Sequence, residues 1–183
     1  MQTTPLWRQL TWWALAFPIV MFAALMTGNF FVLNWTHVLS GALWTGADIF
    51  MGFMVGPVVR KLEMPQRAAV IRYLVPRTIL YFPMVSLTTT TAGWFLAAKL
   101  GYLNPASAQF PWTIAALAIV AILTVQGLGI FLPNSIRMWL ELQKPQPDGA
   151  RIGRLARINF ALAAVQGIFQ VAIIFVMSHF VVG

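Results

Sequence analysis

The chain has 183 residues, of which 60% are hydrophobic and 9% are charged, and its formal net charge is +8. A soluble domain typically has about a quarter of its residues charged, so this chain has too little polar surface to face water on all sides. Cysteine is absent, which excludes disulfides, thiolate metal sites and cysteine nucleophiles. The basic residues lie in the gaps between apolar stretches, as topology signals do, which argues against a nucleic-acid partner. These properties predict an integral membrane protein whose main partner is the lipid bilayer.

Five apolar segments follow one another, each close to the roughly 20 residues needed to cross the hydrocarbon core. The first follows Arg8 and is longer than the apolar part of a signal peptide, so we expect it to be retained as a helix. The sequence therefore predicts an all-α fold, a single domain over residues 1–183 formed by a bundle of five transmembrane helices. The expected spans are 10–28, 31–59, 77–98, 112–132 and 158–181.

The distribution of Lys and Arg predicts the orientation. Between the second and third spans, and again between the fourth and fifth, the connections are rich in basic residues, whereas the opposite side holds only Lys99. Because cytoplasmic loops carry the excess of positive charge, we expect the N-terminus in the cytoplasm and the C-terminus outside. The localisation predicted is the inner (plasma) membrane, with several passes. The inner stretch 65–75 is expected to form a short interfacial helix, and Arg151, Arg154 and Arg157 are expected to contact anionic headgroups.

The second span carries the chemistry-bearing pattern. His37, Gly41, Trp44 and Asp48 are spaced by four, three and four residues, so they share one face of a helix. Asp48 lies near the middle of the span, where an ionisable group costs a few kcal/mol and is expected to face the bundle interior with a partner. This face is a candidate site for a proton, a ligand or a cofactor.

Polar side chains on three other spans are expected at a similar depth. Together with Asp48 they are predicted to form an Asp–Thr–Gln network in the middle of the bundle. Two interpretations stay open: the network only holds helices together, or it is a proton or ligand site, because helix contact alone does not need an ionisable group. The residues are Thr88, Gln126, Gln166 and Gln170.

The two histidines, His37 and His179, are both expected in the outer half of the membrane. Two neutral imidazoles on different helices can bind one haem iron from opposite sides, and helical bundles commonly hold such cofactors. For a structural zinc site, two ligands are too few. An alternative is that His179 reaches the membrane surface as an interfacial residue.

The second span also resembles a known group. His37, Trp44, Gly46 and Pro57, followed by Val58-Val59-Arg60-Lys61, are similar to the signature helix of the copper-resistance protein D family, of membrane-type protoporphyrinogen oxidases and of uncharacterised relatives, which fit best in size. A similar helix occurs in the membrane domain of certain urate oxidases. The resemblance implies that His37 binds a b-type haem or otherwise serves redox chemistry.

Three functions are compatible with these residues. The first is haem binding or a redox process, with His37 as ligand and with Trp44 and Gly41 shaping the cofactor wall. The second is a small proton-coupled transporter or permease component that uses Asp48 and the glutamines. The third is a non-catalytic subunit or assembly factor of a larger membrane complex, or a homo-oligomer. No complete catalytic motif is present, and an enzymatic activity would be that of a membrane oxidoreductase.

Overall fold

The computed structural model describes residues 5–182, and it is 86% helical with no strand in that range. Two short 3-10 turns, η1 (Leu6–Arg8) and η2 (Trp12–Leu15), precede α1 (Ala16–Thr27). The remaining elements in chain order are α2 (Phe30–Ile49), η3 (Phe50–Val55), α3 (Gly56–Lys61), α4 (Met64–Lys99), α5 (Phe110–Gln126), η4 (Gly127–Phe131), α6 (Leu132–Leu142) and α7 (Gly149–Val182).

These elements form four long apolar helical runs and one shorter run, which confirms the predicted all-α membrane bundle of five transmembrane helices. Because the chain crosses an odd number of times, its two ends lie on opposite sides. The shorter run is Trp12–Thr27, and the long ones are Phe30–Lys61, Met64–Lys99, Phe110–Leu142 and Gly149–Phe180.

The first two spans form a tight hairpin. Gly28 ends α1 in the left-handed conformation with φ of 66°, which glycine adopts without the steric cost of a side chain. Asn29 then caps α2, because its side-chain oxygen accepts a hydrogen bond from the amide of Val32 at 3.0 Å. Two residues are therefore enough to reverse the chain.

The expected separate interfacial helix at residues 65–75 is not observed. That stretch is the first part of α4, which begins at Met64 after a capping box formed by Glu63 and Gln66 and continues without a break to Lys99. The stretch is continuous because Ile71 and Val75 are buried in an apolar cluster with side chains of α6 and α7. Packing against these helices, and not the membrane surface, decides its position.

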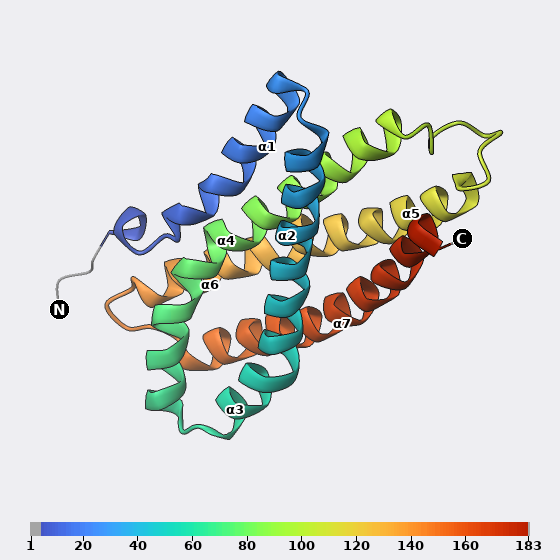
Figure 1. The fold of residues 1–183 in the computed structure, drawn as a ribbon. Coiled ribbons are helices and arrows are strands. Elements are labelled where there is room, and N and C mark those ends of the chain that lie inside the picture. The colour runs from blue at the N-terminus through green and yellow to red at the C-terminus, as the bar shows by residue number, and fades with distance from the viewer. Residues whose placement is uncertain (1–4, 183) are drawn as a thin grey trace.

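The helix α2 lies across α4 and α7 and packs against α4 most extensively, and also against α7 and α1 (Figure 1). The central apolar cluster joins α2, α4, the α5–η4 junction and α7, and it has Trp44, Phe82, Leu123, Phe131 and Ala163 among its buried members. Glycines allow the backbones of η3 and α7 to approach closely: a Cβ atom at Gly52 would overlap the backbone of Ala164. Small residues at such a crossing are typical of membrane helix pairs.

We predict that Gly52→Ala destabilises the bundle by about 1–3 kcal/mol, because the added methyl group has no space unless η3 and α7 separate. The matched control is Gly46→Ala on the same run, where no atom lies within 4 Å of the added carbon. This control should be neutral or stabilising by up to about 1 kcal/mol, since alanine favours helix over glycine. Unfolding of both variants in mixed micelles compares them, and equal midpoints for the two would contradict this account of the crossing.

Candidate functional site

The predicted face of α2 points into the bundle. Trp44 and Asp48 are buried, with 6% and 0% of their surfaces exposed. Gly41 faces α4, since a Cβ atom there would lie 3.3 Å from a Thr89 methyl carbon. His37 is half-buried against the same helix. The spacing in the sequence therefore identified one inward-facing row of side chains.

Two glutamines of α7 hold the carboxyl group of Asp48. The side-chain nitrogen of Gln170 donates to Oδ2 at 2.6 Å. The Gln166 amide, in the orientation in which both its polar atoms find complementary partners, donates to the same oxygen at 3.3 Å and accepts from the backbone amide of Gly127 at 3.2 Å. Turned the other way, it donates to the carbonyl oxygen of Leu123 at 3.3 Å. Asp48, Gln166 and Gln170 are each at most 2% exposed, so this cluster is shielded from solvent and lipid.

Asp48 differs from the other three acidic residues of the chain. Within residues 5–182 it forms no salt bridge, whereas Glu141 pairs with Lys144 at 2.8 Å and with Arg151 at 3.3 Å. Glu63 and Asp148 lie beside the inner connections, at the starts of α4 and α7. Asp48 is therefore the acidic side chain inside the bundle, and the groups around it are the neutral amides of Gln166 and Gln170 and the indole of Trp44.

Several buried oxygen atoms near the middle of the bundle have no hydrogen-bond donor. They are Oδ1 of Asp48, Oε1 of Gln170, Oε1 of Gln126, Oγ1 of Thr88 and Oδ1 of Asn159. A buried polar atom without a partner costs about 1–3 kcal/mol, so this part of the protein favours a species that donates hydrogen bonds. A proton, a water molecule or a ligand with N–H or O–H groups meets that condition.

The predicted Asp–Thr–Gln network is assembled in part. Gln166 and Gln170 bind Asp48, as expected. Thr88 is buried on α4, and Gln126 ends α5 directly before Gly127, but neither forms a described hydrogen bond to Asp48. The sequence placed all of these residues at similar depth, but depth alone does not fix which of them face each other around the bundle.

One polar residue of this region was missed. Asn159 is buried, and its side-chain nitrogen donates to the carbonyl oxygen of Phe131 at 3.2 Å and to Oγ of Ser135 at 3.0 Å. Gln166 and Asn159 thus bind backbone groups at the two ends of η4, a π-helical segment. The signal was present, because 159, 163, 166 and 170 repeat at four, three and four residues and so share one face of α7.

The two histidines contact different helices. His37 places Nδ1 2.8 Å from the carbonyl oxygen of Thr89, and its ring lies against Gly93, where a Cβ atom would be 2.7 Å from Cε1. His179 stacks on Trp112 with ring centroids 3.7 Å apart. In the described part of the chain, no group of three His, Cys, Asp or Glu side chains is placed to hold a metal ion. The paired haem ligation by His37 and His179 stays a prediction.

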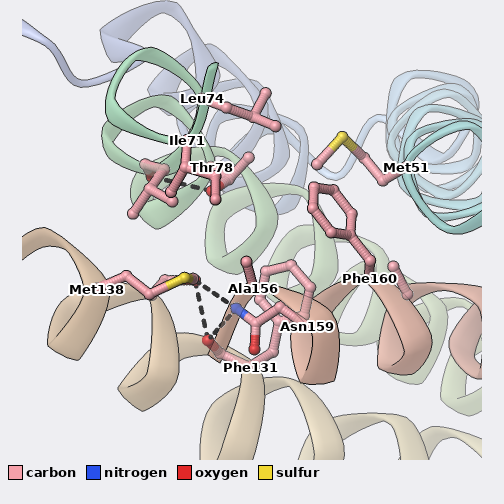
Figure 2. A pocket seen from close by; sticks show the side chains of 12 residues that line it. Met51, Ile71, Leu74, Thr78, Phe131, Met138, Ala156, Asn159 and Phe160 are labelled. Atoms are coloured by element: carbon pink, nitrogen blue, oxygen red, sulfur yellow. Dashed lines mark hydrogen bonds between the residues drawn. The ribbon is translucent and has the colours of Figure 1, made fainter. Parts of the chain in front are cut away.

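Two cavities lie beside the central cluster. The larger one, about 690 Å³ including its open mouth, lies between α4 and the α5–α6 run, and its walls include Trp44 and Gln166. The smaller one, about 360 Å³ on the same basis, lies next to Asn159 (Figure 2). They share the side chains of Thr78, Phe131 and Ser135, so the two cavities are adjacent.

Neither of these cavities is lined by His37 or His179. The hydrogen bond to Thr89 fixes Nδ1 of His37 and leaves Nε2 as the nitrogen for a ligand. The ring, however, packs directly on α4 at Gly93. The residues around His37 therefore do not fit a haem unless α2 and α4 separate at this point.

Comparison with known protein families, with curated proteins and with solved structures finds no match for this chain. Its function is therefore argued from the geometry around Asp48.

Proposed function

We propose that this integral membrane protein is a small proton-coupled transporter, or the proton-binding component of a permease, in which Asp48 takes up and releases a proton inside the membrane. The observation that carries the proposal is the burial of this carboxyl group among neutral amides, with no basic partner in the described structure. An ionisable group at this depth costs a few kcal/mol, so a role that uses its ionisation explains it better than helix contact alone.

The partners of Asp48 suit both protonation states. An ionised carboxylate only accepts hydrogen bonds, whereas a protonated carboxyl group also donates one. The Gln170 amide already donates to Oδ2, and its own Oε1 is buried without a donor. A glutamine amide can therefore stabilise the carboxylate through its nitrogen and the protonated acid through its oxygen. Lys or Arg at this position would favour only the charged state.

The cavities supply a route toward Asp48. Gln166 lines the larger cavity and contacts Asp48, so one side chain separates the carboxyl group from the cavity. Hydroxyl groups of Ser86, Thr90 and Ser135 also line this space. The arrangement supports exchange of a proton at Asp48 without exposing the carboxyl group to lipid.

We predict that Asp48→Asn abolishes proton flux in proteoliposomes, because asparagine keeps the size and the hydrogen-bonding capacity of the side chain but cannot exchange a proton. A pH-sensitive dye inside the vesicles measures the flux, with the membrane potential clamped. His37→Ala is the control and should transport like the wild type. Equal flux through Asp48→Asn and wild type would remove the proposal and leave the network as a helix contact.

Gln170→Leu should lower the proton flux about tenfold, because it removes the shorter of the two amide contacts to a group that becomes charged, and hydrogen bonds to charged groups contribute about 1.5–3 kcal/mol. Gln126→Leu is a matched control, since Gln126 forms no described bond to Asp48. The same vesicle assay compares the two. A larger loss from Gln126→Leu than from Gln170→Leu would contradict the assignment of partners.

Haem binding at His37, expected from the resemblance, stays a second prediction, and it requires α2 and α4 to separate where the ring packs on Gly93. An absorption spectrum of the detergent-purified protein after haem supplementation tests it. A Soret band that is lost in His37→Ala would support this function, and the absence of a band in the wild type would remove it. A role as a subunit would show as co-purification with stoichiometric membrane partners.

A further inference from the structure

The residues that line the larger cavity indicate which class of substrate it binds. We propose that it binds a lipophilic monovalent cation, such as an arylammonium ion, that competes with the proton of Asp48. This inference rests on the proposed function, because it uses the same carboxyl group, and it adds the chemistry of the molecule that is exchanged.

The first argument is the aromatic wall of the cavity. Trp44, Phe82 and Phe131 line it from α2, α4 and η4. The rings of Phe82 and Phe131 meet edge to face, with centroids 5.0 Å apart and planes at 65°. Aromatic faces attract ammonium groups through the negative charge density of the ring, and this attraction strengthens where water is excluded. Three aromatic side chains from three elements form a suitable surface for the apolar part and the charge of such a cation.

The second argument is the charge around the cavity. Its described lining contains no Lys, Arg or His side chain. Asp48 lies directly behind Gln166, whose amide is 3.3 Å from the carboxylate oxygen. Release of the proton from Asp48 therefore leaves a negative charge beside a cavity that holds no positive charge of its own. A charge in such surroundings is stabilised by a cation of opposite sign, because screening by solvent is weak there.

The third argument is the position of the opening. Leu87 and Leu128 line the cavity and are 47% and 40% exposed, and both lie in the middle of apolar spans. The C-terminal part of α4 and the N-terminal part of α5 run apart toward the connection that joins them (Figure 1). The mouth therefore faces the hydrocarbon layer, and a ligand enters from the membrane. The lining also includes four residues that carry hydroxyl groups, which are Ser86, Thr90, Thr91 and Thr124.

The groups that face Asp48 make the competition simple. From α7 these are the two neutral glutamines, and from α2 the indole of Trp44 one turn away. From α4 the titratable side chain within electrostatic reach is Tyr81, whose hydroxyl group donates to the carbonyl oxygen of Leu43 at 3.0 Å. No second acid or base of the described structure pairs with the carboxyl group. One cation should therefore displace one proton.

Two probes of the same shape test the inference with the detergent-purified full chain. Phenyltrimethylammonium and tert-butylbenzene differ only in the quaternary atom, nitrogen with a positive charge or neutral carbon. Isothermal titration calorimetry should show tighter binding of the ammonium compound, and its affinity should fall as the pH is lowered because protons compete for Asp48. The affinity for tert-butylbenzene should not depend on pH.

Variants then separate charge from fold. Asp48→Asn should weaken binding of the ammonium compound about tenfold or more and leave tert-butylbenzene binding unchanged, which also shows that the variant is folded. Trp44→Leu should weaken binding of the ammonium compound more than Trp44→Phe does, because phenylalanine keeps an aromatic face. Gln126 lies outside the described cavity lining, so the Gln126→Leu variant should bind both probes like the wild type.

The outcomes distinguish the two proposals. Equal affinity for both probes, no binding of either, or ammonium binding that Asp48→Asn leaves unchanged would overturn the substrate class. If Asp48→Asn still loses its proton flux in that case, the proposed function stands and only the substrate class is removed. The reverse result is ammonium binding that requires Asp48 together with a proton flux that does not require it. That result would support the cation site and remove the proton-coupled function.

Discussion

The structure depends on the solvation of one carboxyl group. Asp48 is fully buried, and a charged or polar group that is shielded from solvent must find its partners within the protein. The amide of Gln170, 122 residues later in the chain, supplies a contact of 2.6 Å. This contact joins the second span to the last one. It also fixes how the two helices are rotated about their axes, because both side chains must point at the same spot.

Close backbone approach makes that contact geometrically feasible. Asp48 has a short side chain, so α7 must come near α2 for a glutamine to reach it. Gly52 and Gly56 of the second run and Gly167 of the last remove the side chains that would keep these helices apart. The glycines and the carboxyl group therefore act together. The glycines determine the distance between the two helices, and the carboxyl group determines how the helices are rotated about their axes.

The sequence predicted the architecture well, because apolar length and the spacing of polar residues are local properties. The hairpin at Gly28 and Asn29 and the inward row containing Trp44 and Asp48 follow from turn residues and helical periodicity. The single helix from Met64 to Lys99 was not predicted, since its continuity depends on apolar packing with α6 and α7.

At the site, the limit of the sequence was the arrangement of helices around the bundle axis. Gln166, Gln170 and Gln126 have similar depth and chemistry, yet only the first two contact Asp48. Which helix faces which is set by packing between distant segments, and a single sequence does not display it. The same reason explains why the surroundings of His37 and the two cavities became visible only in the structure.

The π-helical segment η4 has a consequence for how the chain tolerates change in length. A π turn holds one residue more than the α-helical turn it replaces, so the extra residue is absorbed without rotating the helix that follows. Deleting one residue between Gly127 and Phe131 would therefore restore regular winding and leave the orientation of α6 nearly unchanged. Regular α-helical winding of the whole segment at its present length would instead turn α6 by about 100° relative to α5. Ser135 and Met138, both buried here, would then rotate toward the lipid. The π-helical winding of this short segment thus determines which residues of the following helix belong to the core.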